Sequence, residues 1–390
     1  MNHIFVTQDF GPDRGGMARR HVELARRFSD ASNSMSVSTV RIDGYEAFDR
    51  GEKYPIDRQP FHFREANRFS NQIRWANWLT GNKHAKIDVI HCGNIRPTGY
   101  AVDWAHGRLN VPYIVYVNGG DLLREKKKTA ESALKRATAR RILGRASGIA
   151  ATSTWVADLT REVMEQVGVK HIPPIAPLDL GTDSATFAPD RDTGRLRKTW
   201  NVGATDKLMI TVARLVPHKG QDVAIRALAL LARDFPSLRY VLVGEGVDEP
   251  RLRSLASSLG VSDKVIFAGP LADADLPEAY ATSTIYAGPS RIDNEVNAEG
   301  FGISFLEASS SGLPVVAGDS GGVRSAVRVG ETGFVVSPLD VEAFAVEIAG
   351  FLSDDAKRIA FGTAGRNAVL THYNWERVAR ETREFTLSVV

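Results

Sequence analysis

The chain has 390 residues, of which 43% are hydrophobic and 24% charged, and its formal net charge is only +3. This length exceeds what one ordinary hydrophobic core supports, so two domains are expected. The mild charge means that any basic surface must be local, and the single cysteine, Cys92, excludes an internal disulfide framework.

The first residues run from Met1 directly into a strand-like segment, without a basic stretch followed by an apolar one. We therefore expect no secretory signal. No apolar run approaches the length that spans a membrane. Together with the lone cysteine, these features predict a cytoplasmic protein.

Short apolar runs alternate with helical patterns along the whole chain, which predicts an α/β fold with parallel sheets. In the helix expected over 16–28, apolar residues recur on one face. Residues 43–66 mix polar residues with Gly and Pro, and we expect mostly loop there. Strands of the first half are expected near 2–7, 36–42, 87–92, 112–117, 147–152 and 174–180.

The alternation restarts at about residue 206, after a segment over 181–194 that is rich in Gly, Pro and Asp. This segment predicts a boundary between domains 1–183 and 184–373. Two facing doubly wound domains would bind ligands in a cleft at the carboxyl ends of their strands. Strands of the second half are expected near 207–213, 239–243, 264–267, 284–288, 314–317 and 333–336.

The stretch from Glu299 to Glu307 reads as a Gly-rich loop that enters a short helix, with a carboxylate at each end. Its glycines let a ligand approach the backbone, and free N–H groups of a first helical turn suit an anion. Two acids beside such a turn can hold a molecule with hydroxyls and phosphate, such as a nucleotide-sugar. The alternative is a polar loop with one surface Glu.

Two loops after expected strands add candidate ligand groups. Arg214 and Lys219 flank a tight turn after the strand near 207–213, where they form a sensible diphosphate clamp. Gly244 begins a Gly-Glu-Gly turn that lacks the third glycine of a dinucleotide fingerprint. This predicts a turn near a nucleotide rather than a nicotinamide enzyme.

Gly15 and Gly16 lie in the loop after the first strand, just before a helix. Backbone N–H groups there can face a phosphate or a sugar, and a plain strand-to-helix turn is the alternative. Asp273-Ala-Asp275 resembles a metal-binding pair, but Asp275 with Glu278 reads better as a helix cap. No cluster has metal-ligand spacing, so we expect no metal.

Residues 124–145 read as one basic helix with nine cations and two acids. We expect the apolar side of this helix, with Leu134, Ala137 and Ile142, to pack inward and its basic face to be solvated. Peripheral contact with anionic membrane lipid is the alternative. The run has no interleaved aromatics, so nucleic acid is not expected as a partner.

In order, these motifs resemble those of the retaining nucleotide-sugar glycosyltransferases of family 4, which have the GT-B fold of two facing Rossmann-like domains. The similarity covers nearly the whole chain. It includes two Glu separated by seven residues at Glu299 and Glu307. Further matching motifs are Gly15-Gly16, 177–183, Arg214-Leu215 with Lys219-Gly220, Gly321-Gly322, Gly333-Phe334, 338–340 and 373–376. By this resemblance, helix 374–390 crosses back onto the N-terminal domain.

The resemblance implies a role for each matching position. Arg214 and Lys219 would hold the donor diphosphate, and Glu307 would bind the ribose. Glu299 with the backbone of Phe301, Gly302 and Ile303 would bind the transferred sugar. Gly269 and Leu271 would lie near the base, and Gly15 and Gly16 near the phosphate or acceptor.

Two positions depart from the family pattern. Asn118 stands where many relatives carry a His, so it cannot titrate, and Asp121 is the group that would take over. Arg324-Ser325 replaces a frequent Pro-Glu near the donor phosphates. We also consider Arg96, Tyr100 and Trp104 as acceptor contacts, with core or surface roles as the alternative.

The resemblance implies a metal-independent, retaining transferase without a cofactor. It would move a hexose or amino-hexose from a nucleoside diphosphate to a hydroxyl of a small or lipid-linked acceptor and form an α-linkage. A catalytically silent sugar-nucleotide-binding protein and a sugar-nucleotide epimerase on the same fold are the alternatives. The base, the sugar, the acceptor and the oligomeric state carry no sequence signal that we can read.

Overall fold

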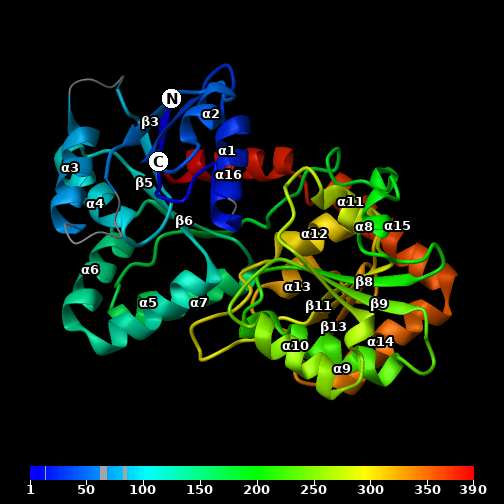
Figure 1. Cartoon of the computed structure of the whole chain (residues 1–390). Helices are drawn as coiled ribbons and strands as arrows, with labels where there is room; N and C mark the ends of the chain where they lie inside the picture. The colour runs from blue at the N-terminus through cyan, green and yellow to red at the C-terminus, as the bar shows by residue number, and fades with distance from the viewer. Residues whose placement is uncertain (14, 62–67, 82–85) are drawn as a thin grey trace. The chain divides into compact units, whose positions relative to one another are not determined.

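A computed structural model describes residues 1–13, 15–61, 68–81 and 86–390. The chain forms two compact units, one of residues 1–179 with 375–390 and one of residues 180–374 (Figure 1). In the described residues, a parallel sheet of seven strands lies in the first unit and one of six in the second. The predicted α/β class with two Rossmann-like domains is therefore confirmed.

The sheet of the first unit has the order β3-β2-β1-β4-β5-β6-β7. After β1 the chain adds β2 and β3 on one side of that strand, and it then returns to add β4 to β7 on the other side, so the strand order reverses between β1 and β4. Its strands are β1 Asn2–Val6, β2 Ser34–Val40, β3 Ile56–Gln59, β4 Val89–Cys92, β5 Tyr113–Val117, β6 Gly148–Ala151 and β7 Ile175–Pro177. Its helices are α1 Gly16–Phe28, α2 Tyr45–Arg50, α3 Arg68–Thr80, α4 Thr98–Leu109, α5 Gly119–Glu131, α6 Ala133–Gly144, α7 Thr154–Val167 and α16 Trp375–Val389.

The second sheet repeats this arrangement, with the order β10-β9-β8-β11-β12-β13 and the reversal between β8 and β11. Its strands are β8 Lys207–Val212, β9 Leu238–Val243, β10 Val265–Gly269, β11 Ile285–Gly288, β12 Val315–Gly318 and β13 Gly333–Val336. Its helices are α8 Arg195–Thr199, α9 Gln221–Leu231, α10 Glu249–Ser258, α11 Leu276–Ala281, α12 Ile303–Ser310, α13 Val323–Ala326, α14 Val341–Ser353 and α15 Asp355–Thr371, with 3-10 turns at Pro189–Arg191 (η1), Pro217–Lys219 (η2) and Ser262–Lys264 (η3).

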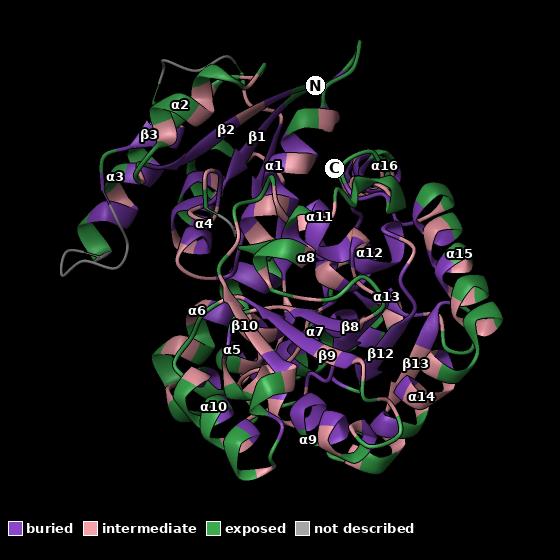
Figure 2. Cartoon of the chain, turned by 45° about the vertical axis from the view of Figure 1, so that its right-hand side comes forward, coloured by how far each residue is buried: buried purple, intermediate pink, exposed green. Residues whose placement is uncertain are grey.

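Central strands such as β5, β11 and β12 are apolar along their whole length because helices cover both faces of a parallel sheet. All five residues of β5 are buried, and all four of β11 and of β12. Figure 2 shows β8, β9 and β12 buried, whereas the outer faces of helices such as α9 and α14 are exposed. Each unit has a hydrophobic core of its own.

Helix α1 spans the predicted residues, and the apolar positions expected on its inner face, Ala18, Val22, Ala25 and Phe28, are buried. Within the first unit, α16 packs beside α1. Arg27 of α1 binds Glu376 at 2.8 Å, and Arg383 of α16 donates to the Phe28 carbonyl at 2.9 Å. The last helix is thus part of the first unit.

Two predictions of local structure are wrong. The loop expected over 43–66 contains α2 and the edge strand β3, and residues 62–66 of that range lie outside the described part. The single basic helix over 124–145 is two helices, because Ser132 has an extended backbone and its side chain caps α6 by accepting the Lys135 N–H. Leu134 and Ala137 are exposed, and Ile142 alone of the three is buried.

Candidate active site

The reversal between β8 and β11 sets the location of the site in the second unit. After β8 the chain moves toward β9, and it returns to the other side of β8 as β11. The connections that follow these two neighbouring strands therefore lead in opposite directions across the sheet, and such a switch point is where open α/β sheets bind ligands. The first loop carries Arg214 and Lys219, and the second leads to Glu299.

An ion pair joins the two loops. Nζ of Lys219 lies 2.5 Å from Oε2 of Glu299, and the two side chains are 19% and 15% exposed. A pair that is this far withdrawn from water is screened less by salt than a surface pair. The two groups remain partly accessible, so a ligand can reach them.

Gly220 explains how the two loops come so close. It ends the η2 turn with φ of +71°, and a Cβ built there would lie 1.9 Å from the Pro289 carbonyl oxygen. Only glycine fits this approach. Lys219, one residue earlier, is thereby held beside the segment that leads to Glu299.

The second acid of the motif is more deeply buried. Glu307 is 4% exposed and lies in the middle of α12, where its Oε2 accepts a 2.7 Å hydrogen bond from the Tyr280 hydroxyl. Gly302 precedes α12 with φ of +95°, and Phe301 and Ile303 on either side of it are buried. The N–H groups of the first helical turn thus begin at the predicted glycine loop.

Arg214 follows the same strand as Lys219 but is exposed. Within the described residues its guanidinium makes no hydrogen bond or ion pair, in contrast to the ammonium of Lys219. The main chain of Arg214 is fixed, since its carbonyl accepts from the side-chain amide of Gln221 at 3.0 Å. Arg214 is therefore an anchored residue whose charged end is available to an anion.

Gly244 and Gly269 extend the same edge of the sheet toward β10. The N–H of Gly244 donates to the Gly269 carbonyl at 2.9 Å, which joins the carboxyl ends of β9 and β10. Leu271 follows two residues later and is half-buried. The structure thus gathers the predicted donor-binding residues of the second unit along one sheet edge, from β10 to α12.

Two further residues near this edge cannot be predicted from the sequence. His218 lies between the cations, and burial, followed by the charge of Lys219, lowers its pKa to about 4. It is therefore neutral at pH 7 and adds no charge to the loop. Tyr280 lies 27 residues before Glu307, and only the packing of α11 on α12 brings the two together.

The remaining predicted site residues lie in the first unit, at the carboxyl ends of its own strands. Gly15 precedes α1 and its N–H donates to Asp13, and Gly16 is the first residue of that helix. Asn118 precedes α5 without capping it, and its buried side-chain nitrogen makes no hydrogen bond in the described structure. Asp121 is paired with Arg124 at 2.5 Å.

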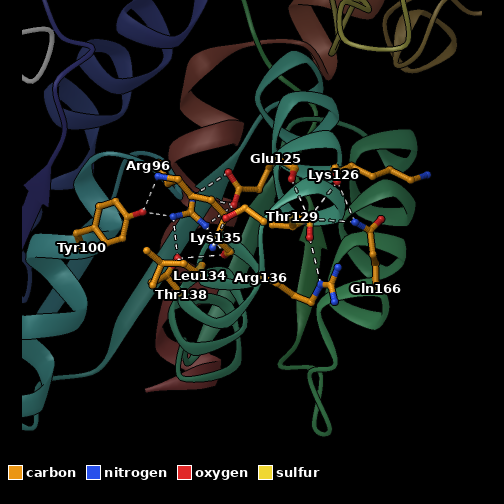
Figure 3. A network of polar contacts seen from close by, with 11 residues as sticks. Arg96, Tyr100, Glu125, Lys126, Thr129, Leu134, Lys135, Arg136, Thr138 and Gln166 are labelled. Carbon is orange, nitrogen blue, oxygen red and sulfur yellow. Dashed lines mark hydrogen bonds and ion pairs between the residues drawn. The ribbon is translucent and has the colours of Figure 1, made fainter.

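Arg96 and Tyr100 belong to a polar network that ties α4 to α5 and α6 (Figure 3). Two nitrogens of the Arg96 guanidinium contact Glu125, and another donates to Thr138 at 2.8 Å. Arg96 is thus engaged inside the first unit, in line with the core role that was its alternative. Trp104 is partly exposed and packs against Arg108 at 5.1 Å from the ring centre.

Asp275 precedes α11 as expected, but its side chain makes no capping bond. It binds Arg195 at 2.5 Å, and the capping interpretation of its side chain is wrong. Glu278 also binds Arg195, at 2.9 Å, and it accepts the N–H groups of Arg195 and Leu196. In the described part of the chain, no group of three or more His, Cys, Asp or Glu is placed to hold a metal ion.

Comparison with known proteins gives the family. The model of "Glycosyltransferase Family 4" matches residues 14–174, and that of "Glycosyl transferases group 1" matches residues 192–368. A GDP-mannose-dependent alpha-(1-6)-phosphatidylinositol monomannoside mannosyltransferase of Mycolicibacterium smegmatis is 36% identical, over 95% of this chain and 94% of its own. A D-inositol 3-phosphate glycosyltransferase of Thermobispora bispora is 26% identical, over 95% and 89%.

Solved structures support the fold. The Anabaena protein HepE in complex with UDP and glucose has a TM-score of 0.78 at 21% identity, and the comparison covers 100% of this chain and 99% of that one. Sucrose-phosphate synthase from Thermosynechococcus elongatus has a TM-score of 0.76 at 20% identity, with 99% and 98% covered. With the relative that is 36% identical along nearly its whole length, these matches show that the chain belongs to the family 4, group 1 glycosyltransferases and is a nucleotide-sugar glycosyltransferase of the GT-B class.

Proposed function

We propose that the chain transfers a mannosyl group from GDP-mannose to a hydroxyl of an inositol-containing, lipid-linked acceptor. The names of its relatives support this choice of donor and acceptor. Relatives that align over nearly the whole chain are GDP-mannose-dependent enzymes acting on phosphatidylinositol monomannoside, and others act on D-inositol 3-phosphate. Among hexoses and amino-hexoses, mannose is thus the first candidate.

The observation that carries the proposal is the placement of Lys219 and Glu299 side by side at the β8/β11 reversal, with Glu307 on the helix that follows. In this assignment, Lys219 and Arg214 bind the donor diphosphate and stabilise the charge that grows on it as it leaves. Glu299 and the N–H groups at Phe301, Gly302 and Ile303 bind the sugar. Glu307 accepts hydrogen bonds from the ribose hydroxyls.

We further propose that transfer retains the α configuration and needs no metal. The bond between the anomeric carbon and the phosphate oxygen breaks, and the acceptor oxygen attacks from the same face. The departing phosphate takes the acceptor's proton, so no side chain needs to serve as base. Cationic side chains at the diphosphate then supply the charge that a metal would otherwise provide.

In the first unit, Gly15 and Gly16 are the proposed contacts of the donor phosphate or acceptor. Asn118 is proposed to bind a sugar hydroxyl, since its side-chain nitrogen is buried and makes no other hydrogen bond in the described structure. Asp121, three residues later, is the acid proposed to take part beside it.

The test is a transfer assay with GDP-mannose, UDP-glucose and related donors, carried out with phosphatidylinositol or its mannosides, with and without EDTA. We expect turnover with GDP-mannose that EDTA leaves unchanged, and an α-linked product by NMR of the anomeric proton. Donor hydrolysis without transfer, a β-linked product, or activity that EDTA abolishes would each contradict one part of the proposal.

A matched pair of variants tests the site. Lys219→Met removes the proposed diphosphate contact, whereas Lys207→Met removes an ammonium at the other end of the same strand, where it pairs with Asp355. We expect the first to lower kcat/KM at least 100-fold, about 2.7 kcal/mol, and the second to leave it within twofold. Equal effects of the two would reject the assignment.

The basic corner of α5 and α6 is the proposed contact with anionic membrane lipid. Lys127, Lys128 and Arg140 are exposed and make no ion pair within the described residues, and Leu134, near the start of α6, is 72% exposed. Exposed cations and an exposed apolar side chain on the same pair of helices suit the surface of an anionic bilayer. In the described part of the chain, no helix is both long and apolar enough to span a membrane.

Sedimentation with phosphatidylglycerol vesicles tests this contact. Changing Lys127, Lys128 and Arg140 to Gln should lower the bound fraction at least fivefold. The control changes three exposed cations of the second unit, Lys198, Arg226 and Arg233, to Gln. If the two triple variants bind equally, net charge alone accounts for binding and the contact is elsewhere.

A further inference from the structure

The Lys219–Glu299 pair bears on how the enzyme discriminates between binding its donor and binding its nucleotide product. We propose that Glu299 is a specificity-determining residue that competes with the diphosphate for Lys219, and so favours the intact nucleotide-sugar over the free nucleoside diphosphate. This inference rests on the proposed function, because it takes Lys219 as the diphosphate contact and Glu299 as the sugar contact.

The geometry makes this competition direct. Oε2 of Glu299 lies 2.5 Å from Nζ of Lys219, in the position that a phosphate oxygen bound to this ammonium would take. Lys219 is the one partner that the described structure gives the Glu299 carboxylate. A diphosphate that binds Lys219 must therefore share the ammonium with this carboxylate or displace it.

The backbone allows Glu299 to exchange partners without a loop movement. Its carbonyl accepts the Gly322 N–H at 2.8 Å, and its own N–H donates to the Ser320 hydroxyl at 3.4 Å. The main chain is thus held against the segment after β12, so the exchange of partners needs only a change of the side-chain rotamer. An ammonium is a compact charge without a fixed fork, so Lys219 also accepts a new anion with little reorientation.

The charges around the pair determine whether loss of the Glu299 charge strengthens or weakens the binding of a diphosphate. Arg214 and Lys219 attract a diphosphate, His218 between them is held neutral by burial, and the charges of Glu299 and Asp293 reach His218. Asp222, on the helix after the loop, is already paired with Arg291 at 2.9 Å. Removing the charge of Glu299 therefore frees Lys219 and also removes a repulsion near the bound phosphates.

Donor and product differ in what they offer Glu299. An intact nucleotide-sugar brings hydroxyls that replace Lys219 as hydrogen-bond partners of the carboxylate. The free nucleoside diphosphate brings none, so Glu299 either keeps its hold on Lys219 or lies beside the phosphates without a partner, which is costly where water is partly excluded. Glu299 thus weakens the product specifically and helps it to leave after transfer.

Calorimetric titration of GDP and GDP-mannose into the full-length chain tests the proposal, with Glu299→Gln and Glu295→Gln as a matched pair. Glu295 lies on the same loop and is exposed, so its change removes the same charge away from Lys219. We expect Glu299→Gln to bind GDP about tenfold more tightly and GDP-mannose no more tightly than the unchanged chain. Glu295→Gln should change both affinities by less than twofold.

A second background separates competition from simple repulsion. In Lys219→Met the shared ammonium is gone, so adding Glu299→Gln should tighten GDP less than threefold. A full tenfold gain in that background would mean that Glu299 repels the phosphates without competing for Lys219. If Glu299→Gln melts early, Glu299→Ala serves for the GDP measurement.

The outcomes distinguish this inference from the proposed function. GDP affinity that is unchanged or lower in Glu299→Gln, with turnover of GDP-mannose by the unchanged chain, overturns the competition and leaves the donor assignment standing. An unchanged chain that binds neither nucleotide overturns both. A GDP gain matched by an equal gain for GDP-mannose would show that Glu299 does not discriminate between them.

Discussion

The hydroxyl of Tyr280 donates a 2.7 Å hydrogen bond to Oε2 of Glu307, and both side chains are buried. The phenol comes from α11 and the acid from α12, so the bond fixes the rotamer of Glu307 across two helices. A hydrogen bond to a charged group contributes roughly 1.5–3 kcal/mol, and its loss weakens the orientation of the carboxylate that we propose as the ribose contact.

Tyr280→Phe should therefore raise KM for the donor roughly tenfold and change kcat by less than threefold. It should also narrow the preference for GDP over 2′-deoxy-GDP, because the proposed contact of Glu307 with the ribose 2′-hydroxyl would be misaligned. The control is Tyr286→Phe, which removes another buried phenol whose partner is Ser304 at 2.8 Å. Equal loss of ribose preference in both variants would indicate a packing effect.

The Arg96–Glu125 pair predicts a large effect on stability (Figure 3). Arg96 is 10% and Glu125 5% exposed, so Arg96→Met leaves a carboxylate buried without its counterion. Such a change costs about 3–5 kcal/mol, whereas Arg124→Met at the exposed pair with Asp121 should cost under about 1 kcal/mol. Urea unfolding measures both.

A double-mutant cycle sharpens this prediction. If the cost of Arg96→Met comes from the stranded acid, then adding Glu125→Gln should recover at least half of it. Additive losses would instead place the cost in the bonds of Arg96 to Thr138 and to the Lys135 carbonyl.

Much of this fold can be predicted from local patterns, and α1 is the clearest case. Its apolar residues recur at helical spacing and its ends are marked by Gly15 and by the polar run after Phe28. The buried strands are equally plain. By contrast, α2 and β3 are short and polar, and the edge position of β3 follows from tertiary pairing with β2.

The loop positions of the site residues can be predicted from the sequence, but the side chains with which they pair cannot. Lys219 and Glu299 are 80 residues apart, and they meet only because β8 lies beside β11, a neighbour relation that no local pattern contains. The same holds for Asp275, whose expected cap is replaced by Arg195 from 80 residues earlier. The break between α5 and α6, by contrast, could be predicted from Ser132, since a Ser before a helical run is a common cap.

Mild acid should destabilise the protein through its buried histidines. Burial lowers the pKa of His21 to about 3 and that of His218 to about 4, and it lowers the pKa of His3 and His91. Below pH 6.5 the unfolded chain takes up protons that the folded chain does not. The free energy of unfolding therefore falls as pH drops from 6.5 toward these folded-state values.

At pH 5.5 His21 and His218 should each reduce the free energy of unfolding by about 1.4 kcal/mol relative to pH 7.5, a range in which most carboxylates stay ionised. Urea unfolding at pH 7.5, 6.5 and 5.5 measures the loss, and NMR of the imidazole of His21 should show no titration above pH 5. A flat stability profile would contradict the prediction.

Alanine substitutions at Gly220 and at Gly260 distinguish the cost of a strained backbone from the cost of a steric clash. Their φ angles are +71° and +70°, so an alanine at either position meets the same left-handed strain, of about 1 kcal/mol. A Cβ at Gly260 contacts nothing within 4 Å, whereas a Cβ at Gly220 would lie 1.9 Å from the Pro289 carbonyl oxygen. Relief of that clash requires the loops after β8 and β11 to move apart.

Gly220→Ala should therefore cost about 1–3 kcal/mol more stability than Gly260→Ala, the usual range for overpacking. It should also weaken GDP-mannose binding at least tenfold, because Lys219 and Glu299 are carried on the two loops that separate. Gly260→Ala should leave donor affinity within twofold. Urea unfolding and calorimetric titration give both quantities, and donor affinity that survives Gly220→Ala would mean that the spacing of these loops does not set the site.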